Sequence, residues 1–98
     1  MLIRVREDQS LALEEEDNFK EFCIRVEDRD TNISALDTIT ERIEDSNYWL
    51  DAQGVIALSS KSTDKKWLNQ FWSMLKDAES YGFADVEAQL IRAHIEIE

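Results

Sequence analysis

The 98-residue sequence has no proline, only two glycines, one cysteine and one histidine. The single cysteine, Cys23, has no partner for a disulfide within the chain. Together with the single histidine, His94, it falls short of the four ligands of a structural zinc site. Gly54 and Gly82 are too few and too far apart for a glycine-rich loop that binds nucleotide phosphates. We therefore expect a fold stabilised by its apolar core alone, without a cofactor or a metal.

The sequence also lacks a long hydrophobic run. Its longest wholly apolar stretch is Val55 to Leu58, whereas a membrane span requires about 20 predominantly apolar residues. The N-terminus does not combine a basic region with an apolar run, as a secretion signal does. We therefore expect a cytoplasmic protein without membrane contact. A chain of this length is near the lower limit for one hydrophobic core, so we expect a single small domain over residues 1–98.

Basic residues are scarce relative to acidic ones. The chain has 11 lysines and arginines against 22 aspartates and glutamates, which gives a net charge of −11. The first fifty residues carry 6 basic and 14 acidic groups, a net charge of −8. Such a surface repels the phosphates of nucleic acids and speeds encounter with a basic protein. The composition therefore favours a protein partner with a basic surface and argues against direct nucleic-acid binding.

Three segments alternate apolar and polar residues, as strands with one buried face do. Their sequences are LIRVRE at the start of the chain, CIRVED from Cys23 and LIRAHIEIE at the end. Between the first two, DQSLALEEEDN contains the acidic run from Glu14 to Asp17. A charged run disfavours burial, so we predict a loop or a short helical turn there.

The middle of the chain predicts a helix and then a hairpin. From residue 33 to about residue 47, apolar residues recur at the spacings of an amphipathic helix: Ile33, Leu36, Ile39 and Ile43. Two strand-like runs in YWLDAQGVIALSS then flank Gly54. Glycine readily takes the positive φ of a tight reversal, so we predict a hairpin there.

A second helix is predicted after Ser62 or Thr63, either of which supplies an N-cap. Gly82 is suited to end this helix in a left-handed conformation. The helix has a broad apolar arc of about 160°, formed by Trp67, Leu68, Phe71, Trp72, Met74, Leu75 and Ala78. We expect Trp67, Phe71 and Leu75 to be buried together with the apolar residues of the first helix. Trp72, on the margin of the arc, should be partly exposed.

After the first strand, the predicted order is strand, helix, strand, strand, helix, strand. This order predicts an α+β fold, with an antiparallel sheet and two helices on one face. It fits the ferredoxin-like split βαβ arrangement economically. The extra N-terminal strand, residues 1–7, should join an edge of the sheet.

Two short motifs around Asp28 do not predict chemistry. The tetrapeptide from Asp28 to Thr31 matches the DxDxT pattern of haloacid-dehalogenase phosphotransferases, which need a larger domain than 98 residues allow. The same region matches the start of a calcium-binding EF-hand loop. However, Ile33 and Ile39 replace the required glycine and glutamate. We expect these polar residues to cap the helix that follows.

Neither Cys23 nor His94 completes a catalytic set. Alternation predicts a partly exposed Cys23 thiol and places His94 on the exposed face of the last strand with Arg92 and Glu96. A nucleophile needs a base and an orienting group, and the sequence indicates neither. We therefore do not expect an enzyme.

The sequence favours a small acidic protein-interaction module: a regulator, an inhibitor or an accessory subunit that occupies a partner surface. The candidate contact residues are the marginal apolar pair of the second helix and acidic residues of the first half: Leu68, Trp72, Glu14, Glu15, Glu16, Asp17, Glu41, Glu44 and Asp45. In one variant, this acidic run and the outer face of the first helix imitate the phosphates of a nucleic acid. The alternative is a small-molecule-binding module or an enzyme that uses the open face of the sheet. A weak homodimer with Trp72 near its centre is a further expectation.

Overall fold

A computed structural model describes residues 1–98 as an α+β fold with a mixed sheet of seven strands and two α-helices. The fold class is as predicted. In chain order, the elements are β1 (Leu2–Val5), β2 (Leu11–Glu14), β3 (Cys23–Val26), the 3-10 helix η1 (Ser34–Thr38), β4 (Thr40–Glu44), β5 (Asn47–Asp51), α1 (Ala52–Leu58), α2 (Lys65–Glu79), β6 (Ala84–Asp85) and β7 (Leu90–Ile97). Neither α-helix has the length and apolarity needed to cross a membrane.

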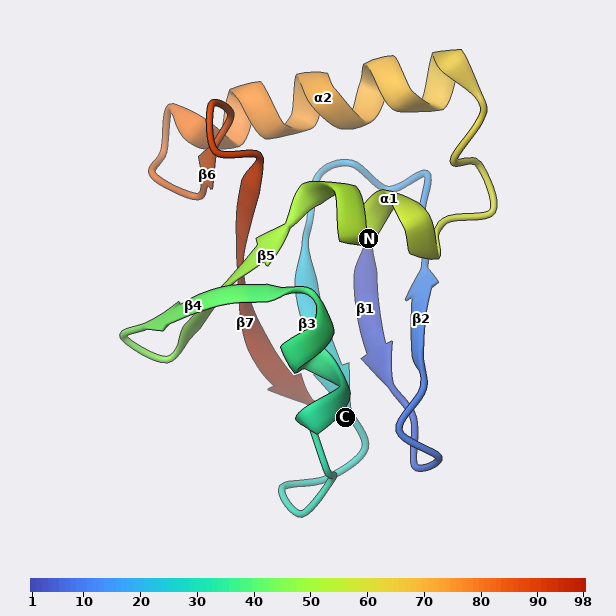
Figure 1. Cartoon of the computed structure of the whole chain (residues 1–98), viewed down its shortest axis with the longest axis vertical. Helices are drawn as coiled ribbons and strands as arrows, with labels where there is room; N and C mark the ends of the chain where they lie inside the picture. Colours follow the sequence, from blue (N-terminus) through green and yellow to red (C-terminus); the bar gives the residue numbers. More distant parts are fainter.

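The strands lie in the order β2-β1-β3-β7-β5-β4, and the short β6 pairs with the beginning of β7 (Figure 1). β1 pairs with β3, and β3 with β7, in parallel; all the other pairs are antiparallel. The long β7 joins the two parts of the sheet. Its first half pairs with β5 and its last residues, Ile95–Ile97, pair with β3.

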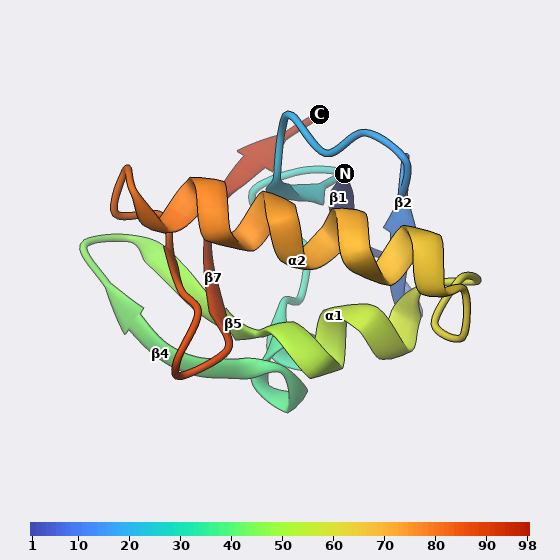
Figure 2. The ribbon, with the colours of Figure 1, turned by 90° about the horizontal axis from the view of Figure 1, so that it is seen from above.

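The ferredoxin-like order is not found. The sheet is mixed, and the N-terminal strand β1 lies inside it between β2 and β3 instead of at an edge. The prediction that both helices lie on one face of the sheet is also wrong. α1 lies against one face, whereas α2 runs across the ends of the strands (Figures 1 and 2). The strand order depends on pairing between residues far apart in the chain, which local periodicity does not reveal.

The predicted helix over residues 33–47 is wrong. This segment forms η1, then β4, and then a two-residue turn into β5. Asp45 and Ser46 both have positive φ, 52° and 67°, as a tight hairpin turn requires. Leu36 and Ile39 are buried as predicted, because a spacing of three also fits a 3-10 helix. Ile43 instead lies on the edge strand β4 and is 60% exposed.

The predicted hairpin around Gly54 is also wrong. β5 ends at Asp51, whose carboxylate accepts a hydrogen bond from the Gln53 amide at 3.2 Å and thereby caps α1. Gly54 lies within this helix. A Cβ atom at position 54 would be only 2.7 Å from Cγ2 of Ile39, so the glycine permits close packing of α1 against the end of η1.

The segment predicted as a loop between β1 and β3 contains a strand, β2. Leu11 and Leu13 pack against the core from this strand. On the other face, Glu14 lies next to Arg4 of β1, with 2.9 Å between Glu14 Oε2 and Arg4 Nε. Four residues of alternation were too short to outweigh the acidic run that follows them.

The second helix is confirmed as α2. It is capped by Asp64 in place of Ser62 or Thr63, since the Asp64 carboxylate accepts from the amides of the first turn. Gly82 has the predicted left-handed φ, 81°, just after the helix. The amides of Gly82 and Phe83 donate to carbonyls of the last turn, which completes a Schellman cap.

The core lies between the sheet and the helices that cover it. Trp67, Phe71 and Leu75 of α2 are buried as predicted, and the rings of Trp67 and Phe71 stack at 5.4 Å. From the sheet, the core takes the residues that alternate with the polar ones, such as Ile24 and Val26 of β3. The opposite face of the sheet is therefore lined by polar side chains.

Candidate functional site

The acidic residues predicted as contacts do not form one surface. Glu14 to Asp17 lie at the end of β2 and in the loop after it, whereas Glu41, Glu44 and Asp45 belong to the β4–β5 hairpin on the other side of the molecule (Figure 1). The hairpin residues are all exposed. The predicted continuous track of charge is therefore not assembled.

The acidic run from Glu14 to Asp17 makes internal contacts. The Glu16 carboxylate accepts hydrogen bonds from the Ser60 hydroxyl and from the Ser60 amide, and the hydroxyl lowers the pKa of Glu16. Asp17 lies 2.8 Å from Nζ of Lys61. The Glu16 carbonyl accepts from the indole N–H of the buried Trp67 at 2.8 Å. These contacts fasten the β2–β3 loop to the α1–α2 loop, so this run has a structural role.

Leu68 and Trp72 are half-buried on α2, and both pack against the core. The Trp72 ring meets Phe71 edge-on, with the centroids 5.6 Å apart and the planes at 84°. Trp72 is thus partly exposed, as predicted. Glu15, also a predicted contact, is exposed and takes a positive φ of 51° in the loop after β2.

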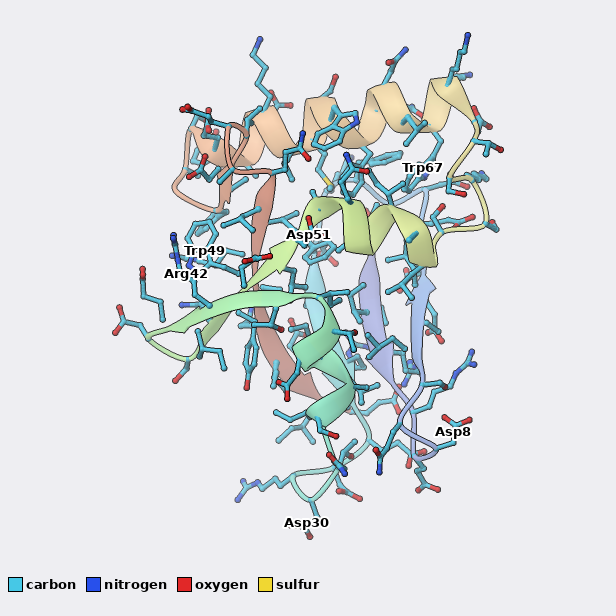
Figure 3. All side chains as sticks on the ribbon, in the orientation of Figure 1. Asp8, Asp30, Arg42, Trp49, Asp51 and Trp67 are labelled. Carbon is cyan, nitrogen blue, oxygen red and sulfur yellow. The ribbon has the colours of Figure 1, made fainter.

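A different group of carboxylates gathers where the parallel strands end. Because β1, β3 and β7 run in the same direction, their carboxyl ends meet at one edge of the sheet, the lower end in Figure 1. Figure 3 shows Asp8 and Asp30 at this end. We call this set the acidic edge, and its six exposed members are Glu7, Asp8, Glu27, Asp28, Asp30 and Glu98.

Two members of the acidic edge repel each other. Hydrogen bonding with the Glu7 side chain and the negative charge of Glu7 raise the pKa of Glu27, and Asp28 and Glu98 add further repulsion. One ion pair partly offsets this charge, that between Arg4 Nη1 and Glu98 Oε1 at 2.8 Å. Arg6 and Arg29 belong to the same segments, and hydrogen bonds from Ser10 together with the charge of Arg6 lower the pKa of Asp8. The acidic edge therefore keeps a net negative charge, and Glu7 and Glu27 are the carboxylates that the fold leaves uncompensated.

The lysines lie away from the acidic edge. All five belong to the β2–β3 loop, the α1–α2 loop and α2: Lys20, Lys61, Lys65, Lys66 and Lys76. These segments are at the upper end of the molecule in Figure 1. The same segments also carry seven carboxylates, so the lysines reduce the negative charge at this end without reversing it.

A cleft of about 680 Å³ lies beside the middle of β7, lined by its polar residues Arg92 and His94 and by the core-facing Ile91 and Ala93. It opens where β7 has a gap on one side, because β6 pairs only with the start of β7 and β3 only with its end. The start of β3, the middle of β7 and the last turns of α2 form its walls. Both Cys23 and His94 line this cleft.

Side chains in the cleft form a short polar chain. Glu96 accepts from Arg25 Nη2 at 3.2 Å and lies 2.8 Å from Nε2 of His94. The hydrogen bond with His94, followed by the charges of His94 and Arg25, lowers the pKa of Glu96. The Cys23 sulfur lies 3.9 Å from Arg25 Nη2. The carboxylate in this cleft is therefore compensated, unlike those of the acidic edge.

Cys23 does not have the environment of an activated nucleophile. It is 8% exposed, so the prediction of a partly exposed thiol is wrong; the loop before β3 and the end of α2 help to enclose it. Burial raises the pKa of the thiol, which favours the less nucleophilic protonated form. His94 is exposed on the face of Arg92 and Glu96, as predicted. It is bound to Glu96, and no hydrogen bond links it to Cys23.

Sequence reasoning missed the acidic edge. Its signal was present as a carboxylate after each of three similar strands, in RED, VED and EIE. Only parallel pairing of these strands brings the carboxylates together. Comparison with protein-family models, curated proteins and solved structures gives no match to this chain.

Proposed function

We propose that this protein is a small acidic interaction module that binds a protein with a basic surface through its acidic edge. The observation that carries the proposal is the group of six exposed carboxylates at the ends of β1, β3 and β7. A protein that binds nucleic acid through a basic surface is one partner of this kind. Binding would occupy that surface and so regulate or inhibit the partner.

The repulsion between Glu7 and Glu27 supports a partner of positive charge. A lysine or arginine placed between these carboxylates would relieve the repulsion and form charge-assisted hydrogen bonds. The acidic run at Glu16 and Asp17 has no such need, because Ser60 and Lys61 already bind it. Uncompensated charge therefore distinguishes the acidic edge from the rest of the acidic surface.

The polarity of the molecule supports a preferred orientation of binding. A basic partner is attracted most strongly to the acidic edge, because the lysines reduce the negative charge at the other end. Such complementarity speeds association and fixes orientation more than it increases affinity. Salt screens these interactions, so the complex should weaken as the ionic strength rises.

The proposal is tested by capture of partners from a nuclease-treated native lysate at about 0.15 M and about 1 M salt. An edge variant combines Glu7→Gln, Glu27→Gln and Asp30→Asn. These three side chains form no ion pair or turn contact within the fold, so the variant should stay folded. We expect wild type to capture a protein at the lower salt only, and the edge variant to lose it.

A hairpin variant provides the matched control. It combines Glu41→Gln, Glu44→Gln and Asp45→Asn, so it loses the same amount of charge from the exposed β4–β5 hairpin. It should capture the same protein as wild type. Equal loss in both variants would mean that net charge alone governs binding. Recovery of nucleic acid without any protein, from a lysate left untreated, would contradict the proposal.

A further inference from the structure

We propose that the cleft beside Cys23 is a binding site for a small organic anion with a flat apolar body. This inference goes beyond the proposed function, because the cleft lies beside the middle of β7 and includes no residue of the acidic edge. Its volume, about 680 Å³, is within the range of about 300–1,000 Å³ that small-molecule pockets occupy.

The apolar part of the cleft is large enough to hold a ring system. About half of its lining residues are hydrophobic, and they come from the loop before β3, from α2 and from β7: Phe19, Phe22, Met74, Ala78, Ile91 and Ala93. At the rim, the rings of Tyr81 and Phe83 stack with their centroids 6.5 Å apart. Tyr81 is 76% exposed, so a flat aromatic surface remains free for a ligand.

The charges of the cleft leave one cation without a partner. Three half-buried charged side chains line it: Arg25, Glu96 and Arg92. Arg25 and Glu96 form an ion pair. Arg92 is the only arginine on a strand that has no carboxylate partner, although the chain has 22 acidic residues. Its guanidinium instead lies 4.6 Å from the centre of the Phe83 ring.

A second donor near Arg92 is also unpaired. Trp49 lies directly opposite Arg92 on β5, and its buried indole N–H has no acceptor. A half-buried guanidinium beside an aromatic ring suits one negatively charged group attached to a flat ring. The exposed rim adds charges of both signs, Lys20 against Glu21 and Asp77, and so does not change this preference.

Two fluorescent probes test the proposal. Anilinonaphthalene sulfonate carries a flat apolar body and one anionic group, and phenylnaphthylamine has the same rings without the sulfonate. We expect saturable binding of the sulfonate by the folded protein and much weaker binding of the neutral probe. Arg92→Gln should weaken sulfonate binding roughly tenfold or more, as loss of a charged hydrogen bond does. Arg92→Lys keeps the charge without the planar stack and should restore part of the affinity.

Arg42→Gln is the matched control, because Arg42 stacks over Trp49 outside the cleft at 4.6 Å. It should bind the sulfonate like wild type. A second readout uses the single cysteine: bound sulfonate should slow alkylation of Cys23 by neutral iodoacetamide, whereas the edge variant should behave like wild type in both assays. Thermal melts verify that every variant is folded. Equal binding of both probes, equal loss in the Arg92 and Arg42 variants, or unchanged alkylation would overturn the proposal.

Discussion

The acidic edge and the cleft place a glutamate in opposite electrostatic environments. At the acidic edge, Glu27 lies beside Glu7, and the repulsion raises the pKa of Glu27. In the cleft, Glu96 lies between Arg25 and His94, which lower its pKa. The fold therefore compensates the glutamate in the cleft and leaves Glu7 and Glu27 uncompensated where three parallel strands end. Charge that the fold does not neutralise is available to a partner.

The largest expected effect concerns the core beneath α2, which holds the helix that forms one wall of the cleft. Phe71→Ala should lower the free energy of unfolding by about 3–5 kcal/mol, because Phe71 is fully buried between Trp67 and Trp72. Chemical denaturation measures the change. Gln70→Ala, at an exposed position of the same helix, should stay within about 0.5 kcal/mol of wild type. A near-wild-type value for Phe71→Ala would show that α2 does not close the core.

Gly54→Ala changes packing without changing charge, so it is a reference for the two charged sites. Gly54→Ala should destabilise the protein by about 1–3 kcal/mol, because the added methyl group meets Ile39 at 2.7 Å. Alanine favours helix by about 1 kcal/mol over glycine, so a stabilised variant would mean that Ile39 moves away easily. The loss should be the same at every pH between about 4 and 8, since neither residue titrates.

The two glutamates should give opposite pH profiles. Glu27 has a raised pKa, so its ionisation opposes folding; this penalty is absent at low pH and is complete above the raised pKa. Glu96 has a lowered pKa, so its stabilisation is present above the ordinary glutamate pKa of about 4.3 and is lost as the pH falls. At neutral pH, Glu27→Gln should therefore raise the Tm and Glu96→Gln should lower it. Both differences should shrink in acid, and differences of the same sign would refute the contrast.

The smallest effect is expected for self-association. A weak homodimer centred on Trp72 remains a prediction, because the half-buried ring offers apolar contact while the net charge of −11 opposes pairing. Sedimentation at several concentrations and moderate salt should show wild type associating more than Trp72→Ser. The strand β7 offers no full edge for such a dimer, since β5 pairs along one side and β6 and β3 pair with the two ends of the other. Equal behaviour of the two chains would remove Trp72 from any interface.

Local sequence patterns predicted an element correctly where an apolar stripe repeats over several turns or where a capping residue marks its end. The helix α2 was predicted because its apolar stripe repeats over four turns and Gly82 marks its end. The helix predicted from Ile33 was wrong, because the spacing of Leu36 and Ile39 fits both an α-helix and the observed 3-10 helix. The hairpin predicted at Gly54 was wrong because a glycine needed for close packing looks the same in sequence as one needed for a turn.

The candidate sites depend on pairing between distant strands, which is why the sequence did not predict them. The acidic edge exists because β1, β3 and β7 are parallel, which brings Glu7, Glu27 and Glu98 to one edge. The cleft exists because β7 changes partners along its length. Composition did predict the excess of negative charge, but not which carboxylates the fold would neutralise.

Reversal of one charge at the acidic edge tests the central claim most directly. Capture of the salt-sensitive partner is measured for Glu27→Lys and for Glu41→Lys, which makes the same change on the exposed hairpin. Glu27→Lys should abolish capture while raising the Tm, because a cation beside Glu7 replaces repulsion with attraction. Glu41→Lys should retain capture. Undiminished capture by Glu27→Lys, or equal loss in both variants, would contradict the claim that the acidic edge keeps its charge for a partner.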